Sequence, residues 1–215
     1  MSLLKTTLLF LSIFLFSFLH AQDIKAKEIL DKVSSKNKAY KTIEAEFNFK
    51  RENLQDKSTN SSKGKVWIKG NMYKLDLMGT ESYYNGKTNW SFIKDANEVN
   101  ISDPDPKEDG AINPAKLFSI YESGFKYKFI SEKFEHSLAL YEIELYPVDI
   151  KKEFTKMILQ IDKDKMQIYS FRRYDKNGTH YTIEITKTSY NTELGDSFFI
   201  YDPKAHPKAQ VNDMR

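Results

Sequence analysis

The sequence predicts a mostly β member of the α+β class, in which a strongly curved antiparallel sheet forms an incomplete barrel closed by a lid of helices. Three observations predict it. About ten segments alternate apolar and polar residues, and several are joined by short Gly- or Asn-containing turns. Only two segments have helical spacing. No Gly/Ser-rich linker divides the 215-residue chain, so we expect one domain.

The first twenty-one residues have the layout of a secretory signal peptide. Lys5 precedes an apolar run from Leu8 to Leu19, which is shorter than the roughly 20 residues a spanning helix needs. Small side chains at Ser17 and Ala21 suit a signal peptidase. We therefore expect cleavage after Ala21 and export to the periplasm, with residues 22–215 as the mature domain. The alternative, an uncleaved membrane anchor, is disfavoured by the length of the run.

The composition excludes several classes of protein. Loss of the signal peptide removes only Lys5, which lowers the formal net charge from +3 to +2. Lysines and acids alternate along the chain, unlike the clustered cations of a nucleic-acid-binding surface. The chain contains no cysteine, so it needs a core without disulfides and cannot carry a lipidated N-terminal cysteine.

The mature chain opens with a predicted helix of about fifteen residues that begins at Asp23 and fades by Asn37. Its apolar residues recur at helical spacing: Ala26, Ile29, Leu30 and Val33. The period then changes to two, with Ile43, Ala45, Phe47 and Phe49 alternating with polar residues, which predicts a strand with one wet face.

More strands follow, most of them joined by short turns. The dipeptides Gly70-Asn71, Asn85-Gly86 and Asn177-Gly178 are typical of tight hairpins. The expected strands are Lys65–Lys69, Met72–Met78, Tyr83–Tyr84, Asn89–Ile93, Glu98–Ile101, Phe125–Ile130, Leu138–Leu145, Phe154–Ile161, Met166–Tyr174, Thr179–Thr188 and a short Phe198–Tyr201. A Pro-punctuated tail ends the chain.

One loop in the middle interrupts the strands. It starts at Asp103 and runs to Ile112, after which Asn113-Pro114 opens a predicted short helix through Ile120. Asn at the cap and Pro at the first helical position are a standard helix start.

No pattern of residues predicts catalysis, a metal site or a cofactor. The mature chain has three scattered histidines, His136, His180 and His206, without metal-ligand or triad spacing. The carboxylates alternate with apolar residues, as on a solvated strand face. A hydrolase with paired carboxylates stays open as an alternative, and it requires two acids about 5 to 10 Å apart in a polar cleft.

Aromatic residues make up 14% of the chain and gather in its middle third. They either pack an inert core or line an apolar cavity. A filled concave face would favour a peptide- or sugar-binding module, whereas a dry and open one would favour a carrier.

Six segments together resemble the periplasmic outer-membrane lipoprotein carrier family, LolA. They are Ile29-Leu30-Asp31-Lys32-Val33-Ser34-Ser35, Tyr40-Lys41-Thr42-Ile43-Glu44-Ala45-Glu46-Phe47, Gly64-Lys65-Val66-Trp67-Ile68-Lys69, Tyr73-Lys74-Leu75, Asn85-Gly86-Lys87-Thr88-Asn89-Trp90 and Asn113-Pro114-Ala115-Lys116-Leu117-Phe118. Their order and spacing cover nearly the whole mature chain.

This resemblance implies a function and its partners. The chain would be a monomeric, non-enzymatic carrier that takes up acyl chains of lipoproteins and ferries them from the inner to the outer membrane. An inner-membrane ABC-type extractor would load it and an outer-membrane acceptor would unload it. The alternative is a carrier or sensor of the same fold for another lipid or lipidated ligand.

The resemblance also implies which residues bind. The family's second and third hairpins and its lid helix correspond to Tyr73, Leu75, Leu77, Tyr84, Trp90, Phe92, Leu117, Phe118 and Ile120. One position departs from the family: its arginine-proline pair after the strand lysine is replaced here by Gly70-Asn71. If a cation closes the lid, Lys69 or Lys74 would have to supply it, and lysine is a poorer multidentate donor than arginine.

Overall fold

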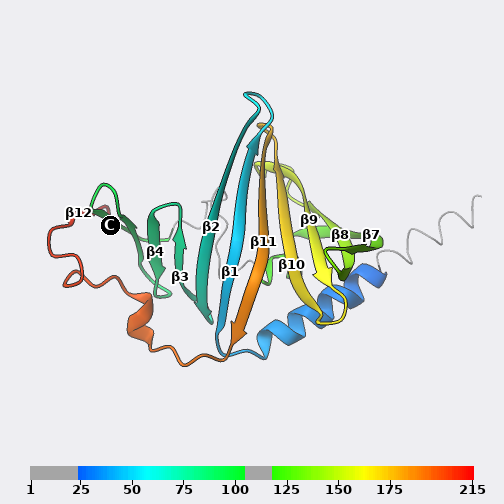
Figure 1. The fold of residues 1–215 in the computed structure, drawn as a ribbon, viewed down its shortest axis with the longest axis horizontal. Coiled ribbons are helices and arrows are strands. Elements are labelled where there is room, and N and C mark those ends of the chain that lie inside the picture. Colours follow the sequence, from blue (N-terminus) through cyan, green and yellow to red (C-terminus); the bar gives the residue numbers. More distant parts are fainter. Residues whose placement is uncertain (1–23, 105–117) are drawn as a thin grey trace, which may run out of the picture.

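The computed structural model describes residues 24–104 and 118–215, in which twelve strands form one sheet (Figure 1). The strands are β1 (Ile43–Asn53), β2 (Ser58–Lys69), β3 (Met72–Leu77), β4 (Thr80–Tyr84), β5 (Asn89–Ile93), β6 (Glu98–Ser102), β7 (Phe125–Glu135), β8 (Leu138–Pro147), β9 (Phe154–Asp162), β10 (Gln167–Asp175), β11 (Thr179–Tyr190) and β12 (Gln210–Asp213). Two 3₁₀ turns, η1 (Ile120–Glu122) and η2 (Asp196–Phe199), interrupt them. The described part of the N-terminal helix covers residues 24–38.

The sheet follows the order β12-β6-β5-β4-β3-β2-β1-β11-β10-β9-β8-β7. Every pair is antiparallel except β12 and β6. β1 and β11 join the two halves through a long pairing from Ile43↔Tyr190 to Asn53↔Thr179. Register shifts in β1–β11, β9–β10 and β7–β8 mark bulges, which bend strands and increase their twist.

The prediction of an incomplete barrel closed by a lid of helices is wrong. The sheet is open, because β12 and β7 are opposite edges that do not pair with each other. The described residues contain one α-helix and no helical lid. The physical reason is that the sheet buries its two faces separately: the N-terminal helix packs on one, and part of the other is covered by the C-terminal segment, so no closure is needed to bury the apolar residues.

Two smaller expectations also change. Residues 113–117 of the second predicted helix lie outside the described part of the chain, and the described remainder is a turn followed by η1. The segment Phe198–Tyr201 is not a strand, since its first half belongs to η2. A strand that the sequence did not predict, β12, pairs in parallel with β6.

The main core lies between the helix and the sheet. Helix residues Ala26, Ile29, Leu30 and Val33 share one buried cluster with the inward residues of β1, β2, β8, β9 and β10. Side chains from the middle of this cluster have no exposed surface: Ile143, Leu145, Leu159 and Ile161. A second, smaller core on the opposite face contains Tyr83, Phe92, Val99 and Tyr201.

Gly64 shows how closely the sheet packs at the junction of β1 and β2. A Cβ atom added there would lie 2.3 Å from Cζ of Phe47 and 3.1 Å from a methyl group of Leu77. The ring of Phe47 therefore occupies the space that any larger residue at position 64 would need.

Candidate functional site

The helix covers only part of the sheet. In Figure 1 it runs along the ends of the strands on the β7–β10 side. Lys25 Nζ lies 2.6 Å from Glu132 Oε1 of β7, and Lys36 donates to the carbonyl of Lys165 in the β9–β10 turn. Side chains of β8, β9 and β10 beneath the helix are accordingly fully buried.

Beyond the helix, the same face carries apolar side chains that stay half-buried. We call this set the open apolar face. It consists of Phe49 on β1, Tyr73, Leu75 and Leu77 on β3, and Tyr181, Ile183 and Ile185 on β11.

The strand register puts these residues on one side of the sheet. Phe49 pairs with Ile183 across β1 and β11. On the other side of β1, Val66 pairs with both Ala45 and Leu75. Because side chains alternate along a strand, every second residue from these pairs points to the helix side.

The chain following the undescribed segment is fixed to the helix. Ser34 Oγ donates to Glu122, Lys38 Nζ lies 2.9 Å from the same carboxylate, and Asn37 donates to the carbonyl of Phe118 at 3.2 Å. The hydrogen bond from Ser34 and the charge of Lys38 lower the pKa of Glu122, although burial opposes them. Glu122 is therefore an anionic anchor for η1.

The predicted cavity residues divide between the two faces. Tyr84 lies on the helix side, where it pairs with Tyr73 across β3 and β4 and its ring lies 5.6 Å from that of Tyr73. Phe118 is buried in the main core. Leu117 lies outside the described residues, and Ile120 begins η1.

Trp90 and Phe92 point to the opposite face. Register pairs Tyr84 with Asn89, so Trp90 lies beside Tyr83 instead. Phe92 packs in the second core, 5.7 Å from the ring of Tyr201.

The two candidate lid cations also lie on that opposite face. Lys69 Nζ lies 2.7 Å from Asp196 Oδ1 and donates to the carbonyl of Leu194. Lys74 Nζ lies 4.8 Å from the ring of Tyr83 and 5.4 Å from that of Phe198. Both cations contact the C-terminal segment that covers β2–β6.

Sequence reasoning missed four members of the open apolar face: Phe49, Tyr181, Ile183 and Ile185. The signal was present, because these residues alternate with polar ones in two of the longest strand patterns. Nothing in the sequence indicated that β1 pairs with β11. This pairing places the apolar residues of β11 in the same sheet as those of β1 and β3.

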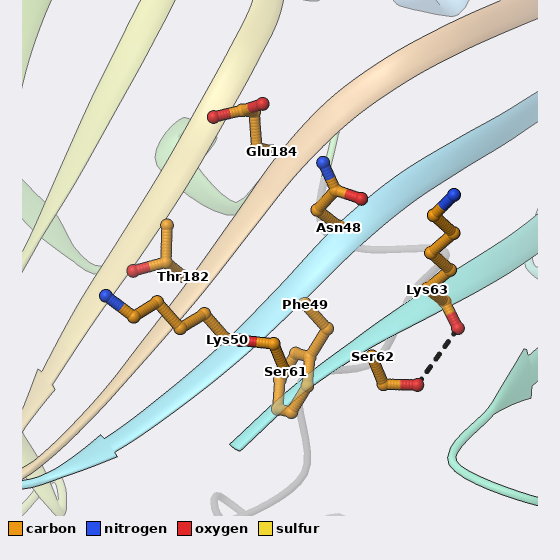
Figure 2. Close-up of a pocket in the computed structure, with 8 residues that line it drawn as sticks. All are labelled: Asn48, Phe49, Lys50, Ser61, Ser62, Lys63, Thr182 and Glu184. Carbon is orange, nitrogen blue, oxygen red and sulfur yellow. Dashed lines mark hydrogen bonds between the residues drawn. The ribbon is translucent and has the colours of Figure 1, made fainter. Parts of the chain in front are cut away.

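A hollow of about 520 Å³ lies over β1, β2 and β11 (Figure 2). Its lining is mainly polar: Asn48, Lys50, Ser61, Lys63, Thr182 and Glu184, with Phe49 and Ser62 completing it. Figure 2 shows Phe49 pointing away from the side chains of Asn48 and Glu184. The polar members stand on the face away from the helix, so this hollow is not an apolar site.

Among the described residues, no three His, Cys, Asp or Glu side chains are grouped to hold a metal ion. Within the same ranges, no helix has the length and apolarity to span a membrane.

A twisted antiparallel sheet with one N-terminal helix over part of a face defines the class of protein: a LolA-like fold. The family described as "Outer membrane lipoprotein carrier protein LolA" matches residues 16–163. The chain belongs to this family.

Solved structures support the fold. An uncharacterized conserved protein from Thermus thermophilus is 15% identical, with a TM-score of 0.58 over 88% of this chain and 99% of that one. A DUF1329 family protein from Desulfovibrio piger is 12% identical, with a TM-score of 0.50 over 86% of this chain and 99% of that one. A comparison with curated protein sequences found no match.

Proposed function

We propose that this chain is a periplasmic carrier that binds the acyl chains of lipoproteins on its open apolar face and ferries them from the inner to the outer membrane. The mature protein is a single domain, residues 22–215, produced by cleavage of a signal peptide after Ala21. It acts as a monomer, without catalysis or a cofactor. Family membership and one structural contrast support the proposal.

That contrast carries the proposal. Under the helix, side chains such as Leu145 and Leu159 are 0% exposed, whereas Leu75, Leu77 and Ile183 on the same face remain partly open. Partly exposed apolar side chains gathered on one face commonly mark a binding surface. An acyl chain lying there would complete the burial of both partners.

The energy of acyl chains in water explains why a carrier is needed. Each methylene is worth about 0.8 kcal/mol, so a fourteen-carbon chain crossing water unshielded costs roughly 11 kcal/mol. An ATP-driven extractor in the inner membrane would load the carrier. An acceptor in the outer membrane would unload it by binding the same chains more tightly.

The first test is native mass spectrometry of the protein purified from periplasm, followed by extraction and identification of any bound molecule. A bound lipoprotein is the expected result. An acyl lipid without protein would favour the alternative, a carrier or sensor of the same fold for another lipid. An empty protein that also fails to take up a fluorescent fatty acid would contradict both.

A pair of variants locates the site. Ile183→Asn places an amide on the open apolar face, and we expect it to weaken fluorescent fatty-acid binding at least tenfold, about 1.4 kcal/mol. Thr182→Asn changes the neighbouring residue on the polar face and serves as the matched control, with unchanged binding. Equal affinities for the two variants would remove the open apolar face from the binding site.

A further inference from the structure

One row of side chains crosses the end of the open apolar face that lies away from the helix. Arg51 of β1 pairs with Tyr181 of β11, and Tyr181 pairs with Arg173 of β10. All three share the face of Phe49, whose ring stacks 6.1 Å from that of Tyr181. Two strand spacings separate the arginine backbones, about 10 Å.

Arg173 is an unusual residue for this position. It is 5% exposed and is the one buried basic side chain among the described residues. Its Nε lies 2.7 Å from Asp175 Oδ1, and its terminal nitrogen donates to Oδ2 at 2.8 Å. The rings of Tyr181 and Phe154 lie 5.0 and 5.7 Å from the guanidinium carbon.

A buried ion pair at this place is costly for the fold. Desolvation offsets much of its Coulomb attraction, and well-packed apolar residues often replace such a pair without loss of stability. Stability alone therefore gives little reason for Arg173 and Asp175 in an apolar surface. A positioning role gives one, because the guanidinium lies against the ring of Tyr181, the residue between Arg173 and Arg51 in the row.

Arg51 adds a second guanidinium to the same end. It is half-buried, and it forms no ion pair with any residue in the described ranges. Its donors are thus available at the edge of the apolar surface, on the row that also contains Arg173.

We propose that Arg51 binds the head-group end of the acyl ligand, donating hydrogen bonds to its ester or carboxylate oxygens, while the chains lie along the open apolar face toward the helix. Arg173, held by Asp175, acts as a positioning residue that packs against Tyr181 between the two arginines. This inference rests on the proposed function. The dimensions fit, since β1 from Arg51 to Ile43 extends about 27 Å, more than the roughly 15 Å of one leaflet that an acyl chain spans in a bilayer.

Arg172 provides a matched control next to Arg173 in the sequence. Its side chain points to the opposite face, is 39% exposed, and lies 3.1 Å from Glu52 in a solvated cross-strand pair. Replacing it removes the same charge from the protein without touching the proposed site.

The experiment measures binding of three fluorescent probes with the same long chain and different heads: a fatty acid, a monoacylglycerol and an alkylamine. The variants are Arg51→Met, Arg173→Met with Asp175→Asn, their combination, and the Arg172→Met control. We expect the combined variant to bind the acid and the ester at least tenfold more weakly, with the alkylamine changed less than twofold. The control should match the parent with all three probes.

The outcomes separate the two levels of inference. Loss confined to the acid assigns an anionic head, and equal loss of acid and ester assigns ester oxygens; either supports the proposal. Equal losses of affinity for all three probes, or no loss for any, would overturn the proposed role of the arginines. Neither result would contradict acyl-chain binding on the open apolar face. Failure of the parent protein to bind any probe would instead reject the proposed function. Arg51→Met, at a half-buried position, keeps the test valid if the buried pair proves necessary for folding.

Discussion

At the scale of single residues, Glu81 is the centre of a charged network on the face away from the helix. Tyr83 donates its hydroxyl hydrogen to this carboxylate, and the ammonium groups of Lys94 and Lys74 lie 3.2 and 3.4 Å from it. Lys94 also lies 2.9 Å from Asp76. Only 18% of the Glu81 side chain is exposed, so solvent and salt screen its ion pairs with Lys74 and Lys94 less than they screen ion pairs at the surface.

The pKa of Glu81 reflects this environment. Burial alone would raise it, but the hydrogen bonds from Tyr83 and Lys94 and the charges of both lysines outweigh burial and lower it. Burial and the contact with Glu81 in turn raise the pKa of Tyr83. The folded state therefore favours ionised Glu81 and neutral Tyr83.

Glu81→Gln tests the network through the dependence of stability on pH. Because the folded pKa lies below the ordinary value of 4.5, Glu81 stabilises the fold above pH 4.5, and this contribution is lost as the pH falls through the folded pKa. We expect the variant to unfold about 1–2 kcal/mol more easily at pH 7, with the difference shrinking below pH 4.5. Urea titrations at several pH values measure it. Glu193→Gln, at an exposed position, is the control, and a pH-independent difference for Glu81→Gln would contradict the explanation.

At the scale of elements, residues 191–209 form a strap across the outer face of β2–β6. Phe198 packs edge-on against Trp67 with ring centroids 5.5 Å apart, and Tyr201 contacts Tyr83 and Phe92. His206 stacks 4.0 Å from the ring of Phe92. The strap then leads into β12, which completes the sheet at β6.

Variants in the strap and in the residues that contact it test how the strap is held on the sheet. We expect Phe198→Ala to lower the unfolding free energy by about 1–2 kcal/mol, because it removes a half-buried ring.

Lys69→Ala and Lys74→Ala should speed hydrogen exchange in residues 191–209 while leaving fatty-acid uptake and release unchanged. Lys204→Ala, at an exposed strap position, is the control. Impaired uptake in either lysine variant would instead support a role for these cations in closing the site.

Most strands were predictable from alternation, because a sheet with one wet face must alternate and Gly-Asn, Asn-Gly dipeptides fix its turns. β12 was not, since Gln210–Asp213 has four residues and little apolar character. Its pairing depends on the strap, not on its own sequence. Phe198–Tyr201 gave a false strand because its aromatic residues pack against Trp67 and Phe92, a contact that no local pattern encodes.

The candidate site was predictable within a strand but not across a hairpin. The face shared by Tyr73, Leu75 and Leu77 follows from alternation alone. For the next hairpin, a four-residue connection pairs Tyr84 with Asn89, which places Trp90 on the other side. A register difference of one residue reverses every side chain, and the sequence does not specify that register.

At the scale of the whole molecule, the open sheet leaves β7 and β12 as separate edges. The long edge strand β7 carries outward lysines at positions 126 and 128 and a bulge between Phe129 and Ser131, both of which disfavour pairing with another chain. β12 is short. Both edges are therefore protected against pairing with a strand of another chain. The open apolar face is a separate surface, and a ligand can bind there without extending the sheet.

This arrangement predicts that a ligand stabilises the entire fold. A ligand at one hundred times its Kd adds about 2.7 kcal/mol to the unfolding free energy. For a domain of this size that corresponds to a rise in Tm of about 5–10 °C. Differential scanning calorimetry with a sixteen-carbon fatty acid measures the shift, and a six-carbon acid at equal concentration, which buries far less apolar surface, should give little. Ile183→Asn should lose most of the shift and Thr182→Asn should retain it. An equal shift with the short acid, or an undiminished one in Ile183→Asn, would mean that stabilisation arises away from the open apolar face.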